Sequence, residues 1–320
     1  MLSLKTIKSA AVIGAGGKMG SGIALVLIGT LALCQNKALV SLIDQNAASL
    51  IRLKKYLQQQ LKKDAEKQII ALRHLYQERT DLVDNQEIIT FHVESALEAV
   101  FLSTSLEETQ NKDLIFEAAS EEIALKVSIL KKVAALSPHG IVLTNTSSIP
   151  IRFLEEQSGL EKRIAGFHFY NPPFIQKLVE IIAPAPLSET CRLLGKELNK
   201  TCVPSKDIAG FIGNGFFMRE ILFSLNLLKK MDTSYIESVY ILDRITKTFL
   251  FRPMGIFQLI DYVGIDVAVN ILSIMSRFLE DPTFGSDLLK TMQRLGKTGG
   301  HHGDSKQKEG FFRYQDGLPD

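Results

Sequence analysis

The chain has 320 residues, and its 37 basic and 35 acidic side chains leave a formal net charge of +2. At roughly 100–200 residues per domain, this length predicts two domains, and 46% hydrophobic with 22% charged residues is typical of a globular protein, which excludes a disordered tail or a collagen. The near-neutral charge argues against a nucleic-acid-binding protein, and three scattered cysteines indicate reduced thiols in a cytosol-like compartment rather than a disulfide framework.

The first predicted elements are a short strand at 9–13, a glycine-rich turn and a helix over about 18–27. The apolar run 10–34 also resembles a signal peptide or a membrane span. However, the four glycines of the turn would each weaken a continuous helix by about 1 kcal/mol relative to alanine. Lys18 would cost a further ~2.5–3.5 kcal/mol at the centre of a bilayer. We therefore expect a strand–turn–helix unit and no membrane insertion.

The first two hundred residues alternate short apolar runs with helical patterns. This alternation predicts βαβ units and an α/β, Rossmann-like, doubly wound sheet that is mostly parallel. The predicted strands are 10–13, 39–43, 88–91, 114–116, 141–143, 164–169 and 178–182.

A long polar segment interrupts this rhythm at about 46–80. It is helical throughout and rich in Lys, Gln and Leu, and it is too long for a simple crossover between strands. The pattern predicts two helices that project from the sheet as a hairpin insertion. Two interpretations are open: a solvated insertion, or a clasp over a ligand.

The last third of the chain predicts helices and no strand. Gly and Pro residues separate five helical patterns at 211–230, 234–249, 255–262, 265–279 and 287–295. We therefore expect an all-α C-terminal domain at 207–320 after a sheet domain at 1–206. The segment 296–309 is a polar, glycine-rich loop.

The glycine turn predicts a dinucleotide site. Such a turn lets a pyrophosphate approach the backbone at the positive N-terminus of the following helix. An acidic residue at the end of the second strand is expected to bond the ribose hydroxyls and would repel a 2′-phosphate, so NAD is favoured over NADP. The turn has one residue more than G-x-G-x-x-G, and a turn that only packs helix against strand is the alternative. The candidate residues are Gly14, Gly16, Gly17, Gly20 and Asp44.

Polar residues that a sheet core does not require gather between 141 and 182. Asn145 and Ser147 follow a buried strand, where ligands of parallel sheets bind. His168 lies between aromatic residues at a strand end, and Glu180 lies within an apolar strand, where a carboxylate is costly unless it is paired. A His168–Glu180 pair would hold one tautomer of the imidazole, as a general base requires.

Ordered motifs throughout the chain support a family assignment. They are MGSGIA at 19–24, EAASE at 117–121, NTSS at 145–148, HFYNP at 168–172, KLVE at 177–180, KDIAGFIGN at 206–214, RPMG at 252–255, LIDYVG at 259–264 and GFFRY at 310–314. Over nearly its whole length the chain resembles the L-3-hydroxyacyl-CoA dehydrogenase family. The resemblance implies NAD-dependent oxidation of 3-hydroxyacyl-CoA to 3-oxoacyl-CoA, in fatty-acid β-oxidation or 3-hydroxybutyryl-CoA metabolism.

The resemblance also implies catalytic roles for residues in the matching motifs. His168 would be the base that takes the 3-hydroxyl proton, and Glu180 its orienting carboxylate. Ser147 would bond the substrate's 3-oxygen, and Asn214 would help to hold it.

Further matching positions are implied to bind the cofactor or the substrate. Glu121, Lys126, Asn145 and Asn171 match cofactor-contacting positions. The hairpin matches the family's substrate clasp, which makes Lys63 and Lys67 candidates for binding CoA phosphates, with a solvated cationic face as the alternative.

The resemblance extends to the assembly of the protein, since it implies a homodimer formed through the helical domain. The scattered cysteines predict a cytoplasmic location, with the mitochondrial matrix as the alternative for a eukaryotic chain. No metal is expected, because His301 and His302 are adjacent and lack chelating geometry without further ligands. Two other functions are open: a dehydrogenase of a free 3-hydroxy acid, and a non-catalytic NAD-binding homologue.

Overall fold

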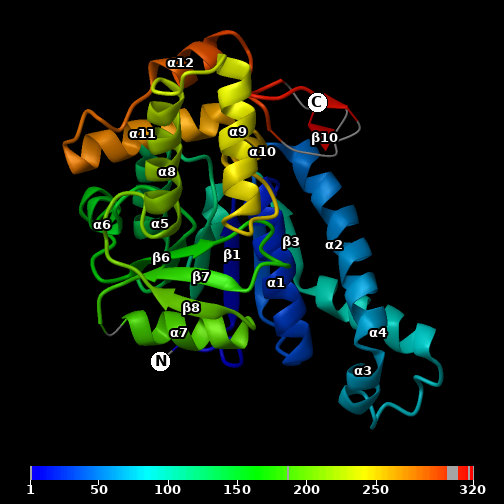
Figure 1. Cartoon of the computed structure of the whole chain (residues 1–320). Helices are drawn as coiled ribbons and strands as arrows, with labels where there is room; N and C mark the ends of the chain where they lie inside the picture. Colours follow the sequence, from blue (N-terminus) through cyan, green and yellow to red (C-terminus); the bar gives the residue numbers. More distant parts are fainter. Residues whose placement is uncertain (1, 186, 301–308, 316–317, 320) are drawn as a thin grey trace. The chain divides into compact units, whose positions relative to one another are not determined.

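The computed structural model describes residues 2–185, 187–300, 309–315 and 318–319. The chain forms two compact units (Figure 1). The first comprises Met1–Ser147 and Ile151–Asp207, and the second comprises Ser148–Pro150 and Ile208–Asp320. The short segment 148–150 therefore groups with the second unit although its neighbours in sequence belong to the first.

An eight-stranded sheet forms the centre of the first unit, in the order β3-β2-β1-β4-β5-β6-β7-β8. Every neighbouring pair is parallel except β6 and β7, which are antiparallel. The central strands are buried nearly throughout, as expected for a parallel sheet covered by helices on both faces. The strands are β1 (Ser9–Ile13), β2 (Leu39–Ile43), β3 (Val100–Ser103), β4 (Leu114–Glu117), β5 (Ile141–Thr144), β6 (Ile164–Phe169), β7 (Leu178–Ile182) and β8 (Thr201–Pro204).

Helices connect most of these strands, so the predicted Rossmann-like fold class is the one observed. α1 begins at Lys18 as predicted but continues to Leu33, because its apolar side chains remain buried beyond the predicted end, as far as Leu31. The other helices of the sheet layer are α5 (Ile123–Leu136), α6 (Ile151–Ser158) and α7 (Leu187–Glu197), with a short 3-10 helix, η1 (Leu106–Thr109).

Two strands differ from the prediction. Residues 88–91 were predicted as a strand, but they lie inside α4 (Asn85–Glu98). A capping box formed by Asp84 and Glu87 begins this helix, and this start signal outweighs the β-branched residues that follow. The third strand in chain order is β3. The edge strand β8 was not predicted, because it is only partly buried and ends in a proline, which edge strands tolerate.

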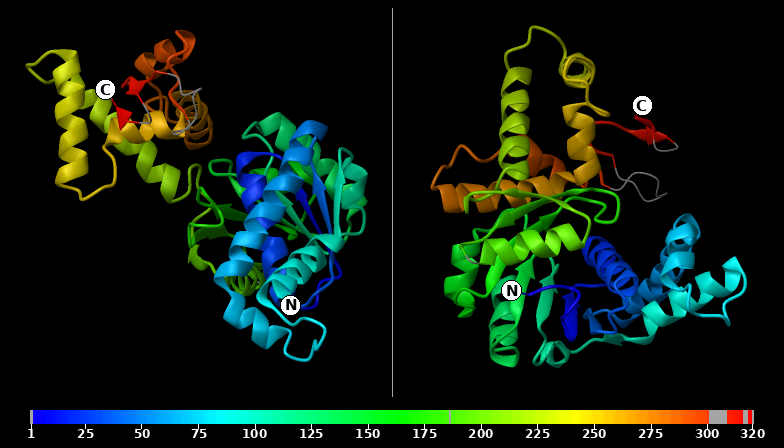
Figure 2. Two further views of the ribbon diagram at one scale, coloured as in Figure 1. Left: turned by 90° about the vertical axis from the view of Figure 1, so that its right-hand side faces the viewer. Right: turned by 90° about the horizontal axis from the view of Figure 1, so that it is seen from below.

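The segment predicted as a helical hairpin is helical, but its two helices, α2 (Ala47–Lys67) and α3 (Ile69–Leu75), are separated by Gln68 alone, and the helix that pairs with α2 is α4. Asn46 caps α2 by accepting a hydrogen bond from the backbone N–H of Ser49 (3.2 Å). Leu50, Leu53 and Leu57 continue along one face of α2 and are buried in the core of the first unit. α2 and α4 lie side by side (Figures 1 and 2). One side of α2 is therefore packed, and the other side is exposed.

The second unit is mainly helical, and its described helices begin and end within two residues of their predicted limits. Its core gathers residues such as Met218, Leu242, Phe257 and Met275. Two short antiparallel strands, β9 (Tyr314–Gln315) and β10 (Leu318–Pro319), were not predicted. The helices are α8 (Gly213–Leu228), α9 (Tyr235–Thr248), α10 (Ile256–Val263), α11 (Ile265–Leu279) and α12 (Asp287–Arg294).

Within residues 2–185, 187–300, 309–315 and 318–319, no single helix is long and apolar enough to cross a membrane. α10 and α11 together have sufficient length and apolarity, but they are bent by 91° relative to each other.

Candidate active site

The glycine turn after β1 is tight and is hydrogen-bonded to the end of the neighbouring strand β2. The backbone N–H groups of Gly14 and Ala15 donate to Ile43 O (2.8 and 3.0 Å), which ties the turn to the end of β2. Gly14 has φ +74°, and a Cβ at Gly20 would lie 2.0 Å from Gly14 O. The turn therefore excludes side chains at both positions and brings the start of α1 against the end of β1.

Asp44 lies at the same edge of the sheet. Its Oδ2 accepts from Gly16 N (3.0 Å) and its Oδ1 from Asn46 N (2.9 Å), so the carboxylate is held between the glycine turn and the start of α2. A hollow of about 330 Å³ opens here, and it is lined by Gly14, Gly17 and Asp44 together with residues 118–120 and the start of α5. A hollow of this size is at the lower end of the range of small-ligand sites, and it lies at the glycine turn and the carboxyl ends of β1 and β2, where dinucleotides bind in sheets of this type.

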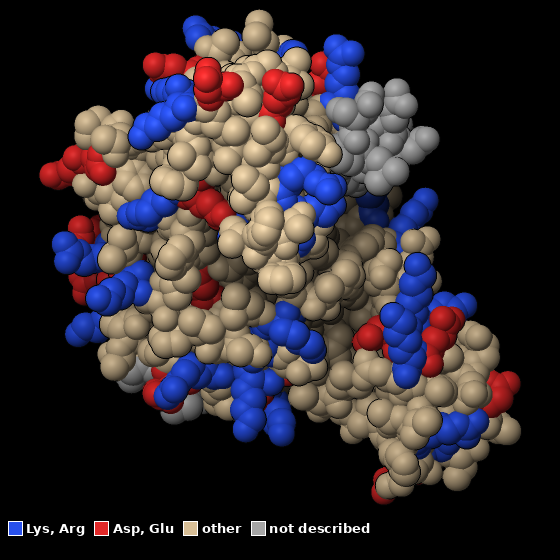
Figure 3. All heavy atoms as spheres, viewed as in Figure 1, with Lys and Arg blue, Asp and Glu red and all other residues tan. Residues whose placement is uncertain are grey.

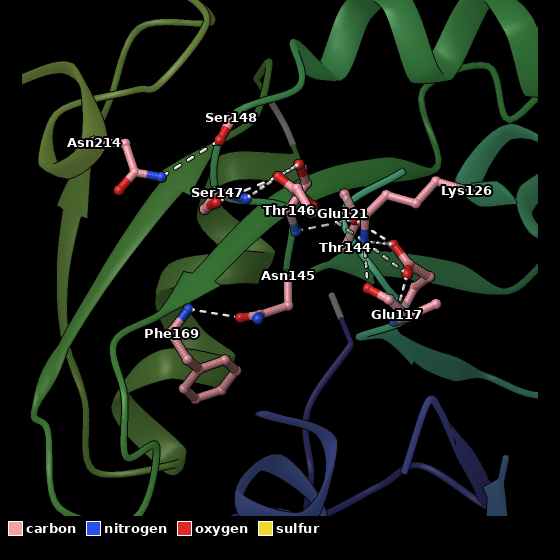
Figure 4. A network of polar contacts seen from close by, with 11 residues as sticks. Glu117, Glu121, Lys126, Thr144, Asn145, Thr146, Ser147, Ser148, Phe169 and Asn214 are labelled. Atoms are coloured by element: carbon pink, nitrogen blue, oxygen red, sulfur yellow. Dashed lines mark hydrogen bonds and ion pairs between the residues drawn. The ribbon is translucent and has the colours of Figure 1, made fainter. Parts of the chain in front are cut away.

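A buried charge cluster lies beside this hollow (Figure 4). Lys126 Nζ contacts Glu117 Oε1 and Oε2 at 2.9 and 3.0 Å, and it also donates to Ala119 O (3.1 Å). Burial alone would lower the pKa of Lys126, but the charges of Glu117 and Glu121 outweigh burial and raise it. Lys126 is therefore a protonated, fully buried cation. A role for Glu117 was not predicted from the sequence, although a carboxylate at the end of an apolar strand indicates a buried partner.

The serine loop after β5 is held by Glu121. The Oε1 atom of Glu121 accepts hydrogen bonds from Thr146 Oγ1 (2.6 Å), Ser147 N (2.8 Å) and Ser147 Oγ (3.3 Å). Asn145 points the other way, and its Oδ1 accepts from Phe169 N (2.9 Å) (Figure 4). The serine loop is therefore hydrogen-bonded on one side to Glu121, just before α5, and on the other side to the end of β6.

His168 and Glu180 face each other across the antiparallel pair of β6 and β7, where they are register partners. His168 Nδ1 lies 3.2 Å from Glu180 Oε1, and the exposed fractions of these side chains are 11% and 1%. The Tyr170 hydroxyl donates to the same oxygen (2.5 Å). Burial and this bond raise the pKa of Tyr170, so it remains a hydrogen-bond donor. The role of Tyr170 was not predicted from the sequence, because nothing in its spacing points to Glu180.

The remaining predicted residues lie apart from these groups or in the second unit. Asn171 follows β6 and precedes Pro172 through a cis peptide bond. Lys63 and Lys67 are exposed on α2, where Figure 3 shows basic side chains close to acidic ones. Within the second unit, Asn214 Nδ2 donates to Ser148 Oγ (3.4 Å).

A metal site was not expected. The described ranges contain no group of three or more His, Cys, Asp or Glu residues suited to hold a metal ion. His301 and His302 lie outside those ranges.

Two family models together match nearly the whole chain. Residues 9–208 match the model described as "3-hydroxyacyl-CoA dehydrogenase, NAD binding domain". Residues 210–314 match the model described as "3-hydroxyacyl-CoA dehydrogenase, C-terminal domain".

Curated relatives and solved structures give the same result. The chain is 31% identical over 320 residues to the mitochondrial hydroxyacyl-coenzyme A dehydrogenase of Rattus norvegicus, covering 97% of this chain and 92% of that protein. It is 29% identical over 316 residues to a probable 3-hydroxybutyryl-CoA dehydrogenase of Bacillus subtilis, covering 97% and 98%. The crystal structure of M. tuberculosis FadB2 superimposes with a TM-score of 0.73 at 26% identity and covers 97% of this chain and 99% of that one.

Proposed function

The chain belongs to the 3-hydroxyacyl-CoA dehydrogenase family, whose members are NAD-dependent oxidoreductases, and from this premise we propose that it oxidises an L-3-hydroxyacyl-CoA to the 3-oxoacyl-CoA. NAD is the cofactor; the glycine turn and Asp44 would hold it, and it would supply the hydride acceptor for the oxidation of C3. The proposed context is fatty-acid β-oxidation or 3-hydroxybutyryl-CoA metabolism.

One observation carries the proposed mechanism: the buried pair of His168 and Glu180. A hydrogen bond from Nδ1 to a carboxylate requires that Nδ1 carry the hydrogen, so Nε2 is the basic nitrogen of the neutral ring. His168 Nε2 would take the proton of the substrate's 3-hydroxyl as hydride leaves C3. The imidazolium formed would be stabilised by Glu180, which is held in place by Tyr170.

Ser147 and Asn214 would bind the substrate's 3-oxygen. The backbone N–H and the hydroxyl of Ser147 both donate to Glu121, which fixes the position of the serine in the loop. A group fixed in advance loses less entropy when the substrate binds, which favours the reactive geometry.

The clasp proposal concerns the projecting helix α2. Lys63 and Lys67 are exposed and lie four residues apart, so they share one face of the helix. We propose that this face attracts the CoA phosphates. Replacing both lysines with glutamate should raise the KM for the CoA ester and leave the affinity for NADH unchanged.

The deciding experiment is NADH oxidation by the purified protein with acetoacetyl-CoA, with free acetoacetate assayed in parallel. Turnover of the CoA ester alone is the expected result. Turnover of free acetoacetate would favour the free 3-hydroxy acid as substrate instead. NADH binding without turnover of short or long 3-oxoacyl-CoA esters would favour a non-catalytic NAD-binding protein.

We also propose that the protein is a homodimer formed through its helical unit. α8 and α9 pack against each other, and they carry large apolar side chains that are mostly exposed in the single chain. Large apolar side chains exposed on neighbouring helices are typical of interaction sites. The most exposed are Phe216 (76%), Phe223 (64%), Ile236 (82%), Tyr240 (57%) and, just after α9, Phe249 (73%) and Phe251 (93%).

A further inference from the structure

Glu117 is a fully buried carboxylate at the end of β4, with an exposed fraction of 0%. Besides both contacts with Lys126, it accepts hydrogen bonds from Thr144 Oγ1 (2.6 Å) and Ala119 N (2.7 Å). An ionised carboxylate in such a position is costly unless every acceptor position is used. Four donor contacts therefore surround the Glu117 carboxylate, although Glu117 contacts none of the residues proposed to bind the substrate.

The contacts of Lys126 show which carboxylate it binds. Its ammonium lies 2.9 Å from Glu117 but 3.5 Å from Glu121 Oε2. Glu117 is therefore the principal partner of the buried cation, and Glu121 is the second. This leaves Glu121 Oε1 to accept the three bonds from Thr146 and Ser147 (Figure 4).

We propose that Glu117 is a positioning residue for the serine loop. By neutralising Lys126, it prevents the cation from drawing the Glu121 carboxylate away from Thr146 and Ser147. A buried ammonium that loses one carboxylate must take its charge compensation from the other, because an unpaired buried charge is strongly unfavourable. The effect on catalysis rests on the proposed function of Ser147, whereas the coupling between Glu117 and the serine loop does not.

The test compares Glu117→Gln with the double variant Glu117→Gln/Lys126→Met, and Lys126→Met completes the cycle. Glu117→Gln leaves the cation with Glu121 alone. The double variant removes both charges of the pair, a change that is often nearly neutral for stability, and leaves nothing to displace Glu121. Glu220→Gln is the matched control, because Glu220 pairs with Arg252 in the second unit (2.5 Å).

The first measurement is amide hydrogen exchange at Ser147, followed by NMR on protein with isotope-labelled serine. The Ser147 N–H is the group held by Glu121, so its exchange reports the coupling without any turnover. We expect exchange at least about tenfold faster in Glu117→Gln, native-like in the double variant and unchanged in Glu220→Gln. If Glu117→Gln does not fold, Glu117→Asp replaces it. This variant keeps the negative charge but moves it away from Lys126, and its Ser147 exchange is compared with that of the double variant in the same way.

The second measurement is turnover of acetoacetyl-CoA at saturating NADH. We expect kcat to fall by about ten- to a hundredfold in Glu117→Gln, because misplacement of a positioned group by ~1 Å can cost that much, and to stay native-like in Glu220→Gln. The double variant is compared by Ser147 exchange alone, because Lys126 matches a cofactor-contacting position.

Unchanged Ser147 exchange in Glu117→Gln would overturn the proposal, and so would equally fast exchange in the single and double variants, which would indicate general loosening. If the native protein turns over no 3-oxoacyl-CoA, the proposed function fails. The exchange data still decide whether Glu117 positions the loop.

Discussion

At the scale of single residues, the proposed chemistry depends on His168. We expect His168→Gln to lower kcat by about 10²–10⁴-fold, the usual contribution of a general base, and to leave NADH affinity unchanged. Turnover of acetoacetyl-CoA and fluorescence titration with NADH measure the two effects. His139→Gln, at an exposed position, is the control that should behave like the native protein. Native-like turnover in His168→Gln would rule out the mechanism.

The sequence was informative about His168 and Glu180 because each is unusual where it stands. A carboxylate inside an apolar strand needs a partner, and the histidine at the end of the preceding strand was the nearest candidate. Tyr170 and Glu117 could not be assigned in the same way. Their contacts depend on which side chains meet between neighbouring strands and loops, and neither composition nor spacing gives that information.

At the scale of elements, the glycine turn should tolerate no side chain at Gly20. A Cβ there would lie 2.0 Å from a backbone oxygen, so Gly20→Ala must distort the turn, and we expect a loss of NADH affinity of about tenfold or more. Gly29→Ala is the matched control on the same helix, where a Cβ would meet only Leu61 Cδ2 at 3.7 Å. It should retain NADH binding and stabilise the protein by ~0.5–1 kcal/mol. Equal affinities in the two variants would contradict this account.

A second element-scale prediction concerns Asp261 in α10. Its carboxylate accepts from Phe311 N (2.9 Å), Phe312 N (3.0 Å) and Tyr314 Oη (2.9 Å), which anchors the closing segment of the chain. Burial outweighs these bonds and raises the pKa of Asp261 to about 6. The folded protein thus holds this proton more tightly than the unfolded chain does. Any stability from this group is therefore present below about pH 4 and lost as the pH rises through about 6.

Urea unfolding of the native protein and of Asp261→Asn at pH 4 and pH 7 tests this. The free energy of unfolding of the native protein should fall relative to the variant by up to about 3 kcal/mol over that range. If the difference in the free energy of unfolding between the two proteins does not change with pH, ionisation of Asp261 does not destabilise the folded protein, and the prediction is wrong.

The helices were more predictable from the sequence than the short strands or the contacts of the site, because helix signals are local. The helices of the second unit follow from local periodicity and Gly/Pro punctuation, which act over a few residues. The strands β3 and β8 are short and partly exposed, so their pairing partners, rather than their own residues, make them strands. Residues 88–91 show the converse, because a helix-starting capping box just upstream determines their conformation.

At the scale of the whole molecule, the apolar residues of α8 and α9 separate into two sets. The sequence pattern could not distinguish a domain core from a subunit interface. In the structure, residues such as Met218 and Leu242 are buried in the helical core, whereas Phe216 and Phe223 are exposed. The two phenylalanines are seven residues apart, about two helical turns, and therefore share one face of α8.

We expect Phe216→Glu with Phe223→Glu to convert a dimer into a monomer, because each glutamate would place a charge in an apolar interface. Light scattering coupled to size exclusion measures the mass. Ile70→Glu, which changes an exposed isoleucine (75%) on α3, is the control and should remain dimeric. A monomeric native protein, or a double variant of unchanged mass, would refute the proposed interface.

The antiparallel pairing of β6 and β7 limits how the loop between them can change. Side chains alternate between the two faces of a strand, so a slip of one residue in this hairpin would turn Glu180 to the opposite face from His168. Insertions that lengthen the loop without shifting the ladder would be tolerated, whereas a single-residue shift inside β7 would separate the pair with no substitution at either position. Homologues and engineered variants should therefore vary in the length of the segment between Tyr170 and Leu178 far more readily than in the spacing of residues within the two strands.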